Sequence, residues 1–152
     1  MGRIKLFLFG IKNDSPESKQ VNKYTNRLRG NKKLEIMISS KRNYTEDEYF
    51  SEISKQKVGC RLVLAHERGT EMDSKQFAEF IKNLEIDTKD TIFAIGPADG
   101  FPKNLLDEAD DLISLSKMTF PHELAALVLV EQIYRALEIL RGTSYHRAGD
   151  RG

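Results

Sequence analysis

The sequence has one cysteine, no tryptophan and only four prolines in 152 residues. A lone cysteine, Cys60, excludes an intrachain disulfide and fits a reducing compartment. No apolar run approaches the roughly 18 residues that a membrane-spanning helix needs. The apolar stretch near the N-terminus is also too short for a signal peptide. We therefore expect a cytoplasmic protein without a membrane segment.

A strong net charge is also missing, because 24 basic residues face 23 acidic ones and leave a formal charge of +1. This balance gives no global argument for a nucleic-acid partner. The first 33 residues nevertheless carry nine Lys and Arg against Asp14 and Glu17. Such a local surplus could meet phosphates. A solvated helix face explains the same pattern, so both interpretations stay open.

Hydrophobic periodicity predicts strands and helices that alternate along the chain. The expected strands are Ile4–Phe9, Leu34–Ile38, Arg61–Ala65, Thr91–Ile95 and Leu112–Ser116. The expected helices follow caps at Ser15, Thr45 and Asp73 or Ser74, and two more span Pro102–Ala109 and His122–Leu140. This alternation is typical of an α/β fold with a mostly parallel sheet covered by helices on both faces. Residues 1–152 are expected to form a single domain.

The helix after His122 is unusually apolar. Residues 124–130 are apolar on every side, whereas a surface helix of a globular protein has one polar face. We expect one side of this helix to pack on its own sheet and the other to be covered by something else. Gly142 suits the end of the helix, and a basic segment follows it.

Three predicted strands end in segments that could bind a ligand, because ligands of parallel sheets bind beyond the carboxyl ends of strands. These segments are residues 65–69, 96–100 and 116–120. Gly96 and Gly100 either let the backbone approach a ligand or simply permit a tight turn. Their spacing matches neither the dinucleotide fingerprint nor the phosphate-binding loop.

Other chemistries have little support. The three histidines are far apart and lack metal-ligand spacing, so we expect no metal site. The acidic run 107–111 is interpreted as a solvated helix end. Glu131 and Arg135, four residues apart, predict either an ordinary surface ion pair or a pair at an interface beside a ligand.

The order of the C-terminal motifs resembles one known family. The resembling segments are Leu115–His122, Glu131–Ala136, Ile139–Gly142 and Tyr145–Arg147, and Ile95-Gly96 with Ala98–Gly100 is similar to the Gly-rich loop of the same family. This is the ribosomal RNA large-subunit methyltransferase H family, a minimal branch of the SPOUT methyltransferases. The resemblance covers essentially the whole chain.

The resemblance implies a trefoil knot formed by the last strand and helix, which periodicity alone does not suggest. It also implies a homodimer packed through the C-terminal helix, which would cover the second apolar side of residues 124–130. The implied reaction transfers a methyl group from S-adenosylmethionine to N3 of a pseudouridine in 23S rRNA on the assembled ribosome.

The resemblance also assigns residues to roles. The implied cofactor contacts are Ala65, Gly96, Leu115, Ser116, Lys117, Met118, Thr119 and Phe120. The implied catalytic and RNA-side residues are Glu131, Arg135, Tyr145, His146 and Arg147. As a hypothesis, His146 or Glu131 assists deprotonation, and the two arginines bind phosphate or the developing anion. The C-terminal segment of one subunit would complete the pocket of the other.

The sequence departs from the family pattern near the expected cofactor pocket. Pro97 stands where a second glycine is usual, Ala65-His66 where Leu and an acidic residue are usual, Thr70 where Lys is usual, and Ala126 where Arg is usual. Residues 148–152 extend past the usual C-terminus. These departures keep an alternative open, a ribosome-binding homologue with impaired cofactor binding. Without the C-terminal motifs, a small-ligand α/β domain unrelated to RNA would fit as well.

Overall fold

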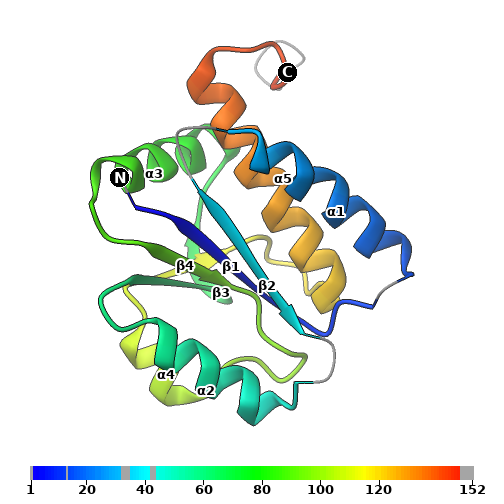
Figure 1. The fold of residues 1–152 in the computed structure, drawn as a ribbon, viewed down its shortest axis with the longest axis vertical. Helices are drawn as coiled ribbons and strands as arrows, with labels where there is room; N and C mark the ends of the chain where they lie inside the picture. The colour runs from blue at the N-terminus through cyan, green and yellow to red at the C-terminus, as the bar shows by residue number, and fades with distance from the viewer. Residues whose placement is uncertain (1, 13, 32–34, 42–43, 148–152) are drawn as a thin grey trace.

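The computed structural model describes residues 2–12, 14–31, 35–41 and 44–147, which form an α/β fold around one parallel sheet. The sheet has five strands in the order β2-β1-β4-β3-β5 (Figure 1). The strands are β1 (Ile4–Phe9), β2 (Ile36–Lys41), β3 (Arg61–Glu71), β4 (Thr91–Ala94) and β5 (Asp111–Ser114). The helices are α1 (Pro16–Arg29), α2 (Glu46–Gln56), α3 (Ser74–Ile86), α4 (Lys103–Glu108) and α5 (His122–Arg141). Each pairing in the sheet is parallel.

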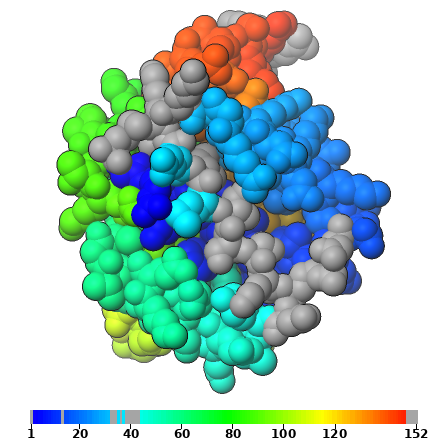
Figure 2. Space-filling view, in the orientation of Figure 1, coloured from blue at the N-terminus to red at the C-terminus, as the bar shows by residue number. Residues whose placement is uncertain are grey.

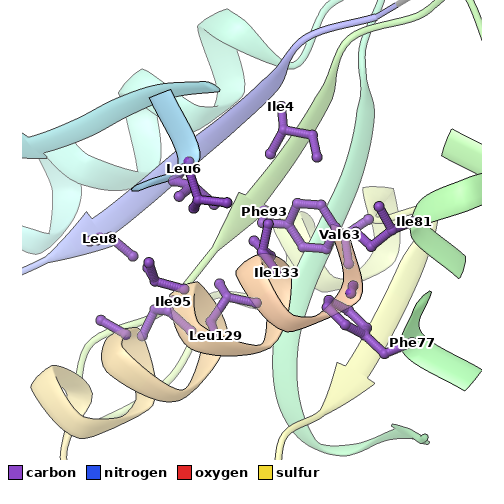
Figure 3. Packing of buried hydrophobic residues seen from close by; sticks show 14 of the residues in the cluster. Ile4, Leu6, Leu8, Val63, Phe77, Ile81, Phe93, Ile95, Leu129 and Ile133 are labelled. Atoms are coloured by element: carbon purple, nitrogen blue, oxygen red, sulfur yellow. The ribbon is translucent and has the colours of Figure 1, made fainter. Parts of the chain in front are cut away.

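Helices cover both faces of the sheet, as the alternating pattern predicts. Ile4, Leu6 and Leu8 of β1 face a cluster with α1, α3 and α5, and Figure 3 shows this cluster around Phe93 and Ile133. Phe7, which lies between Leu6 and Leu8 and points to the other face, belongs to a second cluster with α2 and α4. Successive side chains of a strand point to opposite faces of the sheet. Because both faces are covered here, the sequence of β1 is apolar at nearly every position.

Local capping fixes where the helices begin and end. The side chains of Ser15, Thr45 and Asp73 accept hydrogen bonds from backbone N–H groups in the first turns of α1, α2 and α3. At the end of α5, Gly142 adopts φ +75°, a left-handed conformation that is unfavourable for residues other than glycine. The predicted caps are confirmed at all four positions.

Strand β3 is longer than predicted, and this is the main correction to the fold. The expected strand stops at Ala65, whereas β3 continues to Glu71. Ala65 and Thr70 both pair with Ile113 of β5, so residues 66–69 bulge out of the ladder between them. Gly69 lies so close to β5 that an added Cβ would stand 2.6 Å from the backbone of Ile113. Only glycine fits there.

Smaller differences concern other boundaries. Strand β2 spans Ile36–Lys41 and not Leu34–Ile38, and Leu34 lies outside the described residues. The C-terminal extension 148–152 lies outside them as well. The acidic run 107–111 is only partly a solvated helix end, because Asp110 accepts the Leu62 backbone N–H at 2.7 Å and Asp111 pairs with Arg61 at 2.8 Å.

Helix α5 is buried on one side and half-exposed on the other. Ala126, Leu129 and Ile133 are almost fully buried against the sheet. Leu124 on the opposite side is 36% exposed, and Leu127 is only half-buried. One apolar side of the helix is therefore only partly covered in the single chain, with Leu124 exposed and Leu127 partly buried against the core. In the part of the chain that the structure describes, no helix is long and apolar enough to cross a membrane. The trefoil knot stays a prediction.

Candidate functional site

A cavity of about 410 Å³ lies beside the bulge of β3 and beyond the ends of β4 and β5. Because these three strands are neighbours in a parallel sheet, these parts of them meet at one edge. Seven of the eight residues predicted to contact a cofactor line this cavity: Ala65, Gly96, Leu115, Ser116, Met118, Thr119 and Phe120. The three segments that the sequence pointed to, 65–69, 96–100 and 116–120, border this one cavity, although the first of them is the bulge inside β3 and not the end of the strand.

The loop after β4 gives the cavity a wall made largely of backbone. Pro97 is buried, and its carbonyl accepts a hydrogen bond from the Gly100 N–H at 2.8 Å. Gly100 closes this turn at φ +79°, whereas Gly96 packs so closely that an added Cβ would lie 3.0 Å from the Phe101 ring. The two glycines therefore serve different needs, positive φ at one and close approach at the other.

The loop after β5 is held by short polar contacts. The Ser116 hydroxyl accepts from the Met118 N–H at 2.9 Å, while Ser114 donates to the Ser116 carbonyl at 3.0 Å. The Thr119 hydroxyl donates to Glu67 at 3.0 Å. Lys117 is the predicted cofactor residue that does not line the cavity, and its Nζ lies 3.8 Å from Glu71. The bond between Thr119 and Glu67 joins the loop to the bulge of β3.

Several cavity residues were not among the predicted cofactor contacts. They are His66, Glu67, Arg68, Ile95, Pro97, Ala98, Asp99, Gly100, Phe101, His122 and Ala125. Many lie in the strand-end segments that the sequence pointed to, so taking those segments whole would have found them. His122 carried no such signal. Its Nε2 bonds the Gly10 carbonyl at 3.1 Å, which ties the start of α5 to the end of β1.

A second group of polar residues lies on α5 and the segment after it. Arg135 donates to Glu131 through Nε at 3.3 Å and Nη2 at 2.9 Å. The Tyr145 hydroxyl donates to the same carboxylate at 2.8 Å, and Arg135 Nη1 lies 3.0 Å from His146 Nδ1. Four of the five predicted catalytic residues therefore form one network. The predicted Glu131–Arg135 pair is confirmed, and it is more than an isolated surface pair.

Two members of this network, Arg135 and Tyr145, have raised pKa values. Its hydrogen bond to Glu131 raises the pKa of Arg135 despite partial burial. Burial raises the pKa of Tyr145 above the ordinary value, and its bonds to Tyr24 and Glu131 add to the effect. Because a guanidinium only donates, Nδ1 of His146 must accept, and a neutral His146 ring then carries its hydrogen on Nε2.

The fifth predicted catalytic residue, Arg147, lies outside the network, and the network lies outside the 410 Å³ cavity. Arg147 is exposed, and its Nε donates to the Ser144 carbonyl at 3.1 Å. His146 lines a different cavity of about 560 Å³, between α3, β5 and α5. Among the described residues, none of the five catalytic candidates lines the 410 Å³ cavity. Within one chain the two predicted halves of the site therefore line different cavities, which share Leu115.

Sequence reasoning also missed residues that support the network. Gln132 Nε2 donates to Glu131 at 2.8 Å, and its Oε1 accepts from the Ser74 hydroxyl at 2.8 Å. Tyr24 of α1 contacts the Tyr145 hydroxyl at 3.5 Å. Among the described residues, no three His, Cys, Asp or Glu side chains are grouped as a metal site would require.

Comparisons with known proteins agree on the family. A family model described as "Predicted SPOUT methyltransferase" matches residues 2–146. Two proteins named ribosomal RNA large subunit methyltransferase H align over 95% of this chain. The relative from Geobacter sp. (strain M21) is 35% identical over 98% of its length, and that from Acetivibrio thermocellus is 34% identical over 99% of its length.

Shorter alignments are more similar. The relative of the same name from Koribacter versatilis is 48% identical over 86 residues, which span 59% of its length and 56% of this chain. The chain thus matches somewhat more than half the length of that relative. A solved structure, a probable methylase family protein from Haemophilus influenzae, superposes with a TM-score of 0.53 at 14% identity and covers 95% of this chain and 70% of its own. That likeness concerns the fold alone.

Proposed function

The chain belongs to the SPOUT methyltransferases and, among them, to the ribosomal RNA large subunit methyltransferase H family, and on this basis we propose that it methylates ribosomal RNA. The proposed reaction moves a methyl group from S-adenosylmethionine to N3 of a pseudouridine in 23S rRNA within the assembled ribosome. The proposed setting is the cytoplasm, with residues 1–152 acting as one SPOUT domain. The observation that carries the proposal is the single cavity that gathers seven predicted cofactor residues.

The lining of this cavity fits a cofactor with apolar and polar parts. Ala65, Ile95 and Leu115 offer an apolar surface to an adenine ring, and the surrounding loops offer backbone donors and acceptors. The carboxylates of Glu67 and Asp99 suit ribose hydroxyls and a positively charged sulfur. S-adenosylmethionine, when bound, supplies a methyl carbon activated by a sulfonium. Its transfer needs alignment rather than a metal.

The polar network supplies the proton acceptor in this proposal. Glu131 already accepts bonds from Arg135, Tyr145 and Gln132, so its charge is compensated and it serves better to position its neighbours. His146 keeps one basic nitrogen, Nδ1, which faces Arg135. An RNA phosphate that drew Arg135 away would release this nitrogen to take the N3 proton. Arg147, which is exposed, would bind a second phosphate.

A homodimer through α5 would bring the two halves together. The half-exposed apolar side of α5 at Leu124 and Leu127 is available for a second copy, and Glu131 and Arg135 lie on the same helix. In this arrangement the segment 142–147 of one subunit completes the 410 Å³ cavity of the other. The separation of the two groups within one chain supports this view.

Mixed dimers test this arrangement directly. His146→Ala disables one half of the site, and Gly96→Val disables the other by pressing on Phe101. If each site is shared, a mixture of the two inactive proteins contains heterodimers with one intact site, and methylation returns. If both halves act within one chain, mixing restores nothing, and the dimeric site is refuted.

The activity itself is tested with ribosomes from cells that lack this protein. Purified protein and S-adenosylmethionine should produce a primer-extension stop at one 23S position. His146→Ala should lower kcat about 100-fold, within the range expected of a general base, while Lys55→Ala on α2 should match the wild type. Unchanged turnover of His146→Ala would remove that residue from the mechanism.

The alternative of a non-catalytic homologue is not favoured. Pro97, one of the departures that suggested it, is accommodated in the turn that Gly100 closes. Calorimetric titration with S-adenosylmethionine separates the two functions. Binding is expected, and its absence at millimolar ligand would overturn the enzymatic proposal.

A further inference from the structure

Helix α1 carries a stripe of basic residues that the proposed reaction does not use. Lys19, Lys23 and Arg27 recur at intervals of four residues and are all exposed. The opposite side of the helix buries Ser18, Val21, Thr25 and Leu28. Because four residues advance a helix by about 6 Å and slightly more than one turn, the three cations form a row along its outer face. In Figure 2, α1 lies in blue along the surface of the molecule.

The charges of this stripe are available to a partner. In the part of the chain that the structure describes, none of Lys19, Lys23 and Arg27 takes part in an ion pair, although other surface cations do. The helix carries four basic residues and one acidic residue, Glu17, which lies in its first turn. Among the described residues, no ion pair therefore neutralises the three charges of this stripe.

Arg27 is held in a way that suits phosphate recognition. Its guanidinium lies 5.3 Å from the ring centroid of Tyr24 and 5.4 Å from that of Tyr134. Contact with two aromatic rings orients the planar group, and the N–H groups along its edge can donate to phosphate oxygens. A lysine at this position would keep the charge and lose the orientation.

The stripe leads to the C-terminal half of the proposed site. Tyr24, which contacts Arg27, also contacts the Tyr145 hydroxyl at 3.5 Å, and Tyr134 stacks edge-on against Tyr145 at 4.9 Å. Arg27 further lines a cavity of about 490 Å³ with Tyr134 and Arg141. Glu138 is also in this lining, but its carboxylate is largely buried and bonded to Arg141 at 3.2 Å. Two guanidinium groups and an aromatic ring therefore meet where the row ends.

We propose that the outer face of α1 binds the phosphate backbone of the RNA that flanks the target nucleotide. Lys19, Lys23 and Arg27 contact successive phosphates, and the strand continues past Tyr24 toward Tyr145 and His146. The spacing of the row is comparable to that of neighbouring phosphates on one strand. Such contacts give affinity and register without reading sequence. This inference rests on the proposed function, because it concerns the RNA substrate of that reaction.

The test compares two triple variants of equal charge. Lys19→Glu, Lys23→Glu and Arg27→Glu are combined in one protein, and Lys55→Glu, Lys82→Glu and Lys89→Glu, all at exposed positions away from α1, in the other. The probe is the ribosome from cells lacking this protein. We expect the α1 variant to raise KM for ribosomes at least tenfold and the control variant to change it less than twofold. Affinity for S-adenosylmethionine should be unchanged in both.

Salt dependence and crosslinking identify the partner. Loss of three phosphate contacts should lower the slope of log affinity against log salt by about 2. Arg27→Lys alone should raise KM because the oriented guanidinium is lost, although the charge is kept. Equal KM values for the two triple variants would overturn the inference, as would crosslinking of residue 23 to a ribosomal protein instead of 23S rRNA. If the wild type itself does not methylate ribosomes, the proposed function fails first, and the two failures are distinct.

Discussion

Replacing Glu131 with glutamine tests whether the polar network on α5 stabilises the fold. One carboxylate oxygen accepts from Arg135 Nη2 at 2.9 Å and from the Tyr145 hydroxyl at 2.8 Å, and the other accepts from Gln132 at 2.8 Å. The side chains of Glu131 and Arg135 are 18% and 25% exposed. Glutamine keeps the shape, removes the charge and replaces one acceptor with a donor.

The expected loss follows from these contacts. A hydrogen bond to a charged group contributes about 1.5–3 kcal/mol when buried, whereas an exposed ion pair contributes about 1 kcal/mol or less. For this partly exposed network we expect Glu131→Gln to lower the free energy of unfolding by about 2 kcal/mol and Tyr145→Phe by about 1 kcal/mol. In a chain of this size, a loss of 2 kcal/mol lowers Tm by about 4–8 °C.

Urea unfolding at one fixed protein concentration measures both losses, because dimerisation would make stability depend on concentration. The double variant Glu131→Gln with Tyr145→Phe should lose less stability than the sum of the two single losses, because the two side chains share one hydrogen bond. Glu79→Gln, on the exposed side of α3, is the control and should stay within about 0.5 kcal/mol of the wild type. The network would be refuted as a stabilising structure if Glu131→Gln were as stable as this control, or if the losses of the two single variants added exactly in the double variant.

Alkaline pH gives the same network a second readout. Burial and the bonds to Tyr24 and Glu131 raise the pKa of Tyr145 in the folded protein, so the folded state holds a proton that the unfolded state releases above about pH 10. Tyr145 therefore contributes stability below that pH and loses it as pH rises toward its folded pKa. Tyr145→Phe should flatten the decline of stability above pH 10. An unchanged slope would contradict this assignment.

Three further predictions concern the scaffold. Tyr49→Phe should cost about 1–3 kcal/mol in urea unfolding, because the buried hydroxyl contacts the Ile95 carbonyl at 2.6 Å and that acceptor would lose its side-chain donor. The backbone N–H and the charge of Arg3 lower the pKa of Asp90, so Asp90 contributes stability above about pH 4 that is lost as pH falls through its folded pKa. Asp90→Asn should therefore be less stable at pH 7 and less sensitive to acid. Gly69→Ala should cost more than about 2 kcal/mol, since its Cβ would collide with the backbone of β5.

The elements that the sequence predicted best are those with local causes. A cap such as Thr45 with Glu48 satisfies backbone groups within its own first turn, so four neighbouring residues suffice to locate it. Burial on both faces of the sheet follows from strands that are apolar at successive positions, as in residues 4–9. The meeting of the segments 65–69, 96–100 and 116–120 at one cavity follows from parallel pairing, which alternation of strands and helices predicts.

The parts that were wrong depend on contacts between distant residues. Asp110 and Asp111 lie in an acidic run that looks solvated, yet they bond Leu62 and Arg61 of β3 from about 50 positions away. Tyr49 lies on the buried side of α2, and its hydroxyl reaches the carbonyls of Phe7 in β1 and of Ile95 just after β4. Such pairings need the register of the sheet, and no local pattern contains it.

The bulge of β3 explains how the cavity accommodates unusual residues. Ala65 and Thr70 both pair with Ile113, so the excursion between them is anchored at both ends on β5. Glu67 in that excursion bonds Thr119 in the loop that follows β5, and the two walls of the cavity are thereby fixed to one strand. The shape of the cavity thus depends on backbone pairing more than on the size of the side chains that line it. A small residue at position 65 widens the cavity without moving its walls, so a substitution that shifts β5 should harm cofactor binding more than one at position 65.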